Sequence, residues 1–143
     1  MPKKKQLKKS KIKRFNQKKF LKDLWTLWSM YIRSKDADHR GYVSCFTCGF
    51  TAHWKEMDAG HYWHSVLDFD ERNINVQCRA CNRYKGGNLQ NYSLALIRKH
   101  GSNVLDELAA ARKEYQKTYR YDIIKLKALY EELKKKYGLG KTI

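Results

Sequence analysis

Two CxxC pairs, Cys45/Cys48 and Cys78/Cys81, constrain this 143-residue chain more than any other feature. Two sulfurs from one CxxC turn can bind the same ion, and two such turns complete a tetrahedral zinc site with no open position. The alternative is that the thiols are reduced core residues, but both pairs stand beside Gly, Asn and Arg rather than in apolar runs. We therefore expect a structural zinc ion that holds two distant loops together.

The charge of the chain indicates its class of partner. It has 31 Lys and Arg against 14 Asp and Glu, a formal charge of +17. Such an excess favours a polyanion, most commonly nucleic acid, with a membrane surface as the weaker alternative. No apolar stretch approaches the roughly 20 residues that span a bilayer, and the lysine-rich N-terminus lacks the apolar core of a secretory signal. We expect a cytoplasmic protein with no membrane partner, whose reduced thiols favour metal binding over disulfides.

The pattern of residues divides the chain into three regions. Residues 1–15 form a basic arm that we expect to be disordered and to contact phosphates. Residues 16–101 begin with an amphipathic helix over 16–34, contain a hairpin formed by 42–45 and 50–54, and end with a helix over 88–100 that stops at Gly101. Residues 102–143 are helical again from about 103 to 137, with a break near 118–122. The chain is therefore predicted to be α+β, with helices flanking the cysteine-rich segment.

Apolar residues near the C-terminus follow heptad spacing. This seam could pack onto the first helix of the same chain, or it could form a dimer contact. Two heptads do not distinguish these alternatives, and we favour the dimer contact because of the function argued below. The seam consists of Ile123, Leu126, Tyr130, Leu133 and Tyr137.

A histidine and an asparagine lie within the cysteine-rich segment. His61 stands between the CxxC pairs, and Asn82 directly follows Cys81. Neutral imidazole can take a proton from water near neutral pH, and an amide oxygen can ligate Mg²⁺. Each residue alone is a weak signal, because a lone histidine is usually structural and a lone asparagine is usually a cap or turn residue. Together with the basic surroundings, they are sufficient for metal-assisted phosphodiester hydrolysis.

Four elements follow one another along the chain: Cys45-Phe46-Thr47-Cys48, Gly60-His61, Asn73 and Cys78-Arg79-Ala80-Cys81-Asn82. Their arrangement resembles that of the zinc-containing His-Me finger (HNH, ββα-metal) nucleases. The resemblance implies a small ββα-metal core with a four-cysteine zinc site. It also implies His61 as general base, Asn73 as the residue that orders the loop and Asn82 as a ligand of catalytic Mg²⁺, with Mn²⁺ as a substitute.

Three longer motifs stand in the same part of the chain: Asp58-Ala59-Gly60-His61-Tyr62, Gln77-Cys78-Arg79-Ala80-Cys81-Asn82-Arg83-Tyr84 and the run from Gly87-Asn88 to Tyr92. They carry a closer resemblance, over residues 31–101, to the phage NinG (Rap) recombination proteins. This resemblance implies action on branched recombination intermediates such as Holliday junctions and D-loops, phage or host recombination proteins as partners, and the host cytoplasm as location. The zinc-plus-asparagine layout is also similar to that of phage endonuclease VII, a junction resolvase.

The chain departs from many HNH nucleases directly before the histidine. Where those enzymes place a metal-binding aspartate, this chain has Gly60, and the nearest aspartate is Asp58. Asp58 could ligate Mg²⁺ directly, bind it through water or only orient the turn. His64 could be a second acid–base group, a phosphate contact or an ordinary surface residue.

Basic residues surround the second CxxC pair. Arginine matches phosphate geometry bidentately, so these residues are the expected contacts to DNA. Asp70 and Glu71 could assist a metal site, but pairing with the nearby arginines is the simpler expectation. The predicted DNA-binding residues are Arg72, Arg79, Arg83 and Lys85.

The sequence thus predicts a Mg²⁺-dependent, zinc-stabilised endonuclease that hydrolyses branched DNA. Because a resolvase places two symmetric cuts, we expect a homodimer. One alternative is a general HNH nicking or packaging enzyme without junction preference. The other is a zinc module that binds nucleic acid without cutting it.

Overall fold

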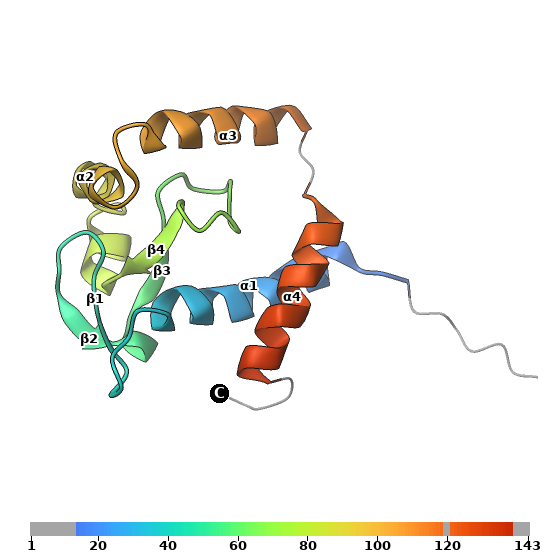
Figure 1. The fold of residues 1–143 in the computed structure, drawn as a ribbon, viewed down its shortest axis with the longest axis horizontal. Helices are drawn as coiled ribbons and strands as arrows, with labels where there is room; N and C mark the ends of the chain where they lie inside the picture. Colours follow the sequence, from blue (N-terminus) through green and yellow to red (C-terminus); the bar gives the residue numbers. More distant parts are fainter. Residues whose placement is uncertain (1–13, 119–120, 139–143) are drawn as a thin grey trace, which may run out of the picture.

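The computed structural model describes residues 14–118 and 121–138, so most of the predicted basic arm lies outside it. The described chain is α+β, as expected, and its helices and strands are arranged as Figure 1 shows. In order, they are α1 (Gln17–Ser34), β1 (Tyr42–Ser44), β2 (Thr51–His53), a 3₁₀ turn (Trp54–Glu56), β3 (Asp58–His61), β4 (Ile74–Gln77), a π-helical segment (Ala80–Tyr84), α2 (Leu89–His100), α3 (Val104–Thr118) and α4 (Ile123–Tyr137).

Helix α1 confirms the helix predicted over 16–34. Asn16 caps it, because its side-chain oxygen accepts a hydrogen bond of 3.1 Å from the backbone N–H of Lys19. The apolar residues at three- and four-residue spacing face inward, and Leu24, Trp28 and Ile32 are buried. This helix contacts both β3 and β4 and forms one wall around the second hairpin.

The strands form two separate antiparallel pairs rather than one sheet. β1 pairs with β2, which confirms the predicted hairpin at the first CxxC turn. β3 pairs with β4 in a register that sets Asp58 opposite Gln77 and His61 opposite Ile74. All four residues of β4 are buried, so this pair lies at the centre of the molecule.

Helices α2 and α3 cover the side of β3 and β4 opposite α1 (Figure 1). Tyr92, Leu96, Val104 and Leu108 form a fully buried cluster that joins the two helices. The Tyr92 hydroxyl lies 2.8 Å from the backbone oxygen of Gly60, so α2 is also anchored to β3. The predicted stop of α2 at Gly101 is confirmed, and this glycine has a φ of 94°.

Helix α4 crosses α1, and the heptad seam lies in the contact between them. Leu126 and Leu133 are buried in one cluster with Leu24, Leu27 and Trp28 of α1. These contacts correspond to the intramolecular alternative. The homodimer, and the part that we expected the seam to have in it, stay predictions.

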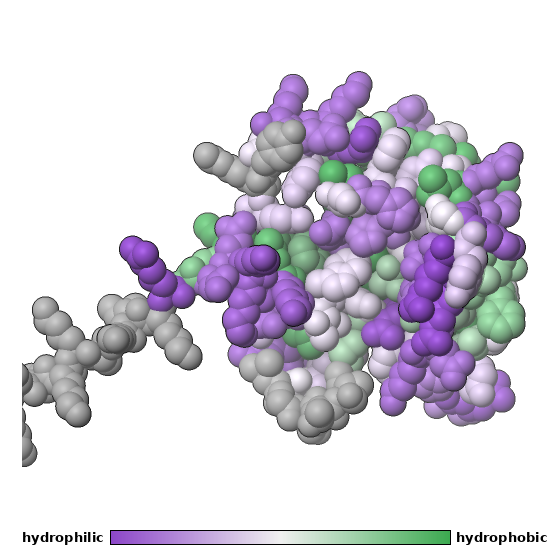
Figure 2. All heavy atoms as spheres, turned by 180° about the vertical axis from the view of Figure 1, so that it is seen from behind, coloured by the Kyte–Doolittle hydropathy of each residue, from purple (hydrophilic) through white to green (hydrophobic). Residues whose placement is uncertain are grey.

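The face drawn in Figure 2 is predominantly hydrophilic, and the hydrophobic residues on it form separate patches. None of the helices in the described residues is long and apolar enough to span a membrane.

Candidate functional site

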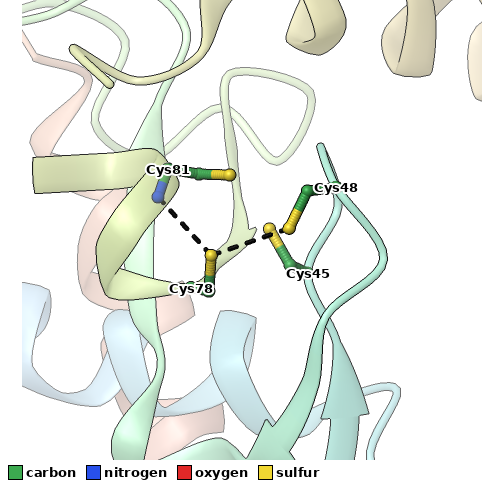
Figure 3. Close-up of side chains that lie close together, drawn as sticks. All are labelled: Cys45, Cys48, Cys78 and Cys81. Carbon is green, nitrogen blue, oxygen red and sulfur yellow. Dashed lines mark hydrogen bonds between the residues drawn. The ribbon is translucent and has the colours of Figure 1, made fainter. Parts of the chain in front are cut away.

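The two CxxC turns meet in space although 30 residues separate Cys48 from Cys78. The four sulfur atoms all lie within 4.8 Å of one another, and those of Cys48 and Cys78 are 3.7 Å apart (Figure 3). Tetrahedral zinc, with Zn–S bonds of about 2.3 Å, requires sulfurs about 3.8 Å apart. All four cysteines are free thiols and three are buried. They could hold a metal ion, and their geometry is consistent with structural zinc.

Neighbouring groups donate hydrogen bonds toward these sulfurs. The Cys81 backbone N–H donates to Cys78 Sγ at 3.4 Å, and the Asn88 side-chain amide donates to Cys81 Sγ at 3.5 Å. Burial by itself raises the pKa of Cys45, but the Thr47 hydroxyl and backbone N–H groups bring this pKa below its ordinary value. Such donors stabilise thiolates and orient them toward a metal.

Asn82 lies in the π-helical segment that begins next to the second CxxC turn. Its backbone N–H donates to the Cys78 oxygen at 3.0 Å, so the turn fixes its backbone. Its side-chain Nδ2 donates to Asp58 Oδ2 at 3.0 Å. The amide nitrogen therefore faces Asp58, and the amide oxygen Oδ1 accepts no hydrogen bond within residues 14–118 and 121–138. This oxygen is the atom that could ligate a hard cation.

Asp58 is held by Arg83 as well as by Asn82. Arg83 Nε donates to Asp58 Oδ2 at 2.8 Å, and its terminal nitrogen donates to Oδ1 at 2.9 Å. Burial by itself raises the pKa of Asp58. The hydrogen bonds from Arg83 and Asn82, together with the positive charges of Arg83 and Arg79, outweigh burial and keep this pKa below its ordinary value. Asp58 is therefore a carboxylate, and a cation that binds it must compete with the guanidinium of Arg83.

His61 ends β3 and is oriented by a residue that the sequence analysis did not select. Its Nε2 lies 2.9 Å from Oδ1 of Asp68, in the loop between β3 and β4. The Tyr121 hydroxyl donates to the other oxygen, Oδ2, at 3.3 Å. Burial raises the pKa of Tyr121, which keeps this hydroxyl protonated. A carboxylate that accepts a hydrogen bond from the Nε2–H group selects the tautomer in which Nε2 keeps its proton. In this tautomer Nδ1 carries no proton and is a free acceptor.

Asp58 and His61 lie at opposite ends of β3. Their three-residue step places them about 10 Å apart and on alternate faces of the strand. His61 faces α1, where its ring stacks on Trp25 with centroids 5.2 Å apart. Trp25 also lines a pocket with Asp58 and Asn82, so it connects the imidazole to the Asp58–Asn82 pair. The histidine and the asparagine thus belong to one region, but they do not share a hydrogen bond.

His64 lies beside His61 and is exposed. The two imidazole rings are 5.9 Å apart and inclined by 24°. His64 is therefore near enough to assist at the same site, and the alternatives considered for it remain predictions.

Asn73 is fully buried and joins the two ends of the loop. Its Oδ1 accepts from the backbone N–H of Trp63 at 2.8 Å, and its Nδ2 donates to the backbone oxygens of Trp63 and Val66 at 3.0 and 3.1 Å. This arrangement matches the loop-ordering role that the resemblance implied. The loop in turn carries Asp68 to His61.

Gly60 is required by its close approach to a buried side chain. A Cβ atom at this position would lie 1.9 Å from Oε1 of Gln77. Gln77 cannot easily move, because its Nε2 donates to Thr47 Oγ1 at 3.1 Å and to the backbone oxygen of Gly87 at 2.9 Å. The position directly before His61 is thus sterically closed to an aspartate.

The predicted DNA-binding residues fall into two groups. Arg79, Arg83 and Lys85 are exposed around the second CxxC turn. Of these three, Arg83 also pairs with Asp58. Arg72 forms ion pairs with two carboxylates, Asp70 at 2.7 Å and Glu107 at 3.2 Å, which offset its charge. Asp70 thus pairs with an arginine, as expected, whereas Glu71 pairs with Lys35 at 2.8 Å rather than with an arginine.

The sequence analysis gave no site role to Trp25, Asp68 or Tyr92, although Tyr92 ends one of the motifs of the family resemblance. Trp25 belongs to the helical apolar pattern, and nothing in its spacing distinguishes a core tryptophan from one that stacks on a histidine. Asp68 follows His61 by seven residues within an irregular loop. Its proximity to a candidate base was the only available signal.

These features define a small α+β protein with a four-cysteine candidate metal centre next to a histidine, an asparagine and an aspartate. The family model described as Bacteriophage Lambda NinG protein matches residues 2–138. The chain therefore belongs to the NinG family.

Curated relatives carry the same name. The chain is 36% identical to Protein ninG of Escherichia phage lambda over 110 residues, which cover 74% of this chain and 50% of the relative. It is 39% identical to Protein ninG of Salmonella phage P22 over 92 residues, 62% of this chain and 43% of the relative. The chain spans about half the length of the curated relatives it matches. No solved structure matches it.

Proposed function

We propose that this protein is a zinc-stabilised, Mg²⁺-dependent endonuclease of the His-Me finger class that hydrolyses phosphodiester bonds in branched DNA. The observation that carries the proposal is the hydrogen bond of 2.9 Å between His61 Nε2 and Asp68 Oδ1. A histidine whose tautomer is selected by a carboxylate is a typical general base. The order of β3, β4 and the π-helical segment along the chain supports the assignment to this class.

In this mechanism, Nδ1 of His61 takes a proton from the water whose oxygen attacks phosphorus, while the bond from phosphorus to the 3′ oxygen breaks. Asp68 keeps the imidazole in position and stabilises the imidazolium that forms. Asn82 Oδ1 is the ligand atom that fits Mg²⁺, which when bound would stabilise charge on the phosphate and on the leaving oxygen. Asp58 holds the Asn82 amide through its nitrogen, and this positioning role needs no displacement of Arg83.

The zinc centre has a structural part in the proposal. Four cysteine ligands leave no open position, so zinc has no site for water. It joins the β1–β2 hairpin to the π-helical segment and thereby holds the backbone of Asn82. The basic residues Arg79, Arg83 and Lys85 lie around that segment and are the proposed contacts to DNA phosphates.

Cleavage of a labelled immobile four-way junction, compared with a linear duplex of matched sequence, tests the proposal. The wild type should cut the junction only when Mg²⁺ is present. His61→Ala should lower the rate by about 10² to 10⁴-fold, because it removes a general base. His39→Ala is the matched control, since His39 is exposed and outside the site, and it should cut at the wild-type rate.

The outcomes separate the alternatives. Equal cutting of junction and duplex would replace the branched-DNA proposal with a general HNH nuclease. Binding with steep salt dependence and no cutting would favour a non-catalytic zinc module. Full activity of His61→Ala would remove His61 from the mechanism.

A further inference from the structure

The pocket between α1 and the Asp58–Asn82 pair contains a cationic group that the sequence analysis did not select. This pocket has a volume of about 280 Å³, and Arg33 of α1 lines it together with Asp58, Asn82 and Arg83. Its remaining lining residues are Trp25, Ser29, Met57 and Ala59. Three chain segments that are distant in sequence therefore meet around one small polar space.

Arg33 is held in a fixed orientation at this pocket. Its Nε donates to the backbone oxygen of Ser29 at 3.1 Å and to the Ser29 hydroxyl at 3.2 Å. The centre of its guanidinium lies 5.2 Å from the centroid of the Trp54 ring. These contacts use Nε and one face of the group, and leave the two terminal nitrogens as donors.

The positive charge of Arg33 is poorly compensated within the chain. In the parts of the chain that the structure describes, its terminal nitrogens donate to no side chain and form no ion pair within 4.0 Å. Burial lowers the pKa of Arg33, and the nearby Asp58 carboxylate offsets this only in part. Asp58 is already bound by Arg83 in a two-bond ion pair, so the pocket keeps an excess of one positive charge.

Resting on the proposed function, we infer that Arg33 and Arg83 form a subsite for one backbone phosphate of the nucleic-acid substrate, in the pocket between α1 and the π-helical segment. A partly buried guanidinium with unused donors stabilises an anion more strongly than an exposed one, because less water screens the interaction. Phosphate is the anion that suits this pocket, since the terminal nitrogens of Arg33 and the terminal nitrogen of Arg83 that does not bond Asp58 can donate to its oxygens, and the chain as a whole has a formal charge of +17. Helix α1 is then part of the DNA interface as well as of the core.

Binding measured in EDTA tests the subsite without cleavage. The affinity for a labelled four-way junction is measured as a function of salt for wild type, Arg33→Gln, Arg33→Lys and Arg40→Gln. Loss of one phosphate contact lowers the slope of log affinity against log salt by about 0.9. Arg33→Gln should show this change with an affinity loss of about ten-fold, because it removes charge-assisted hydrogen bonds.

The other variants separate binding from folding. Arg40→Gln removes the same charge from an exposed arginine that already pairs with Asp38 at 3.2 Å, and it should keep the wild-type slope. Arg33→Lys keeps the charge and should retain the slope while binding more weakly. An Arg33→Gln slope equal to that of Arg40→Gln, with a lowered melting temperature, would overturn the subsite and assign Arg33 to packing against Trp54.

A measurement on the unmodified protein covers the case in which Arg33→Gln does not fold. Wild type is treated with phenylglyoxal with and without bound junction, and modified arginines are located by peptide mass spectrometry. Bound DNA should protect Arg33 and leave Arg40 reactive, whereas equal modification of Arg33 in both samples would overturn the inference. Because neither test depends on cleavage, a failed nuclease proposal and a failed subsite give different results.

Discussion

Nε2 of His61 and Oδ1 of Asp68 lie 2.9 Å apart, and this contact joins the end of β3 to the loop that precedes β4. Tyr121, just before α4, extends the contact by donating to the second oxygen of Asp68. The imidazole is also stacked on Trp25 of α1. A candidate base is thus oriented by three segments, each of which also belongs to the core.

Asp68→Asn should lower the cleavage rate constant by about 10² to 10⁴-fold, because the amide no longer selects the tautomer with a free Nδ1. The Michaelis constant, zinc content and melting temperature should change little, and Asp68→Glu should recover part of the rate. Asp106→Asn, at an exposed aspartate of α3, is the matched control. Full activity of Asp68→Asn would show that His61 needs no carboxylate partner.

Removal of zinc should unfold the cysteine-rich segment. Its sulfurs come from two distant turns, and the ion is the expected link between them. Chelation of the wild type should release one zinc ion per chain, measured by atomic emission, and should lower the melting temperature measured by circular dichroism. Cys78→Ser should contain no zinc and have the same lowered melting temperature.

Thr47→Val is the control, because it keeps all four cysteines. It should still bind one zinc ion, but more weakly, since it loses a hydrogen bond of 3.3 Å to Cys45. A zinc-free Cys78→Ser protein with a normal melting temperature would contradict a structural centre.

Gly60→Ala should lower the free energy of unfolding by about 1 to 3 kcal/mol, because the added methyl group collides with a buried side chain. The colliding atom, Gln77 Oε1, would lie 1.9 Å from the new Cβ. Denaturant unfolding of Gly60→Ala, Gln77→Ala and the double variant measures the effect as a double-mutant cycle. The double variant should be more stable than the sum of the single changes predicts, and strict additivity would show that the collision is not the cause.

Leu133→Ala should lower the free energy of unfolding by about 2 to 4 kcal/mol, as for other buried leucines. Leu133 is 3% exposed and packs against α1, whereas Ile124 on the same helix is 84% exposed. Ile124→Ala is therefore the control and should change stability by less than about 0.5 kcal/mol.

The same variant also distinguishes intramolecular packing from a dimer contact. If the seam acts within one chain, the loss measured for Leu133→Ala should be independent of protein concentration. A loss that shrinks on dilution would return the seam to the dimer interface, because dilution dissociates the wild-type dimer and removes the stabilisation that the variant lacks.

Much of this protein follows from local sequence patterns. Periodic apolar residues and caps place α1 and α2 almost to the residue, because helix formation depends on neighbours three and four positions apart. The CxxC spacing places two sulfurs on each turn for the same local reason. His61 and Asn82 were selected from their positions relative to the CxxC pairs, and Asn73 from the family resemblance. The structure brings Asn73 to the loop and Asn82 to Asp58.

Only the tertiary structure decided which helices and which site side chains contact one another. Packing of α1 against β3 and β4 sets Trp25 on His61 and Arg33 beside Asp58, although each pair is separated by at least 25 residues. The heptad seam shows the same limit, since an apolar stripe does not specify whether its partner is α1 or a second chain. Local patterns determine the elements because they depend on short-range backbone and side-chain geometry. The partners depend on burial and close packing summed over the whole chain, which no local spacing contains.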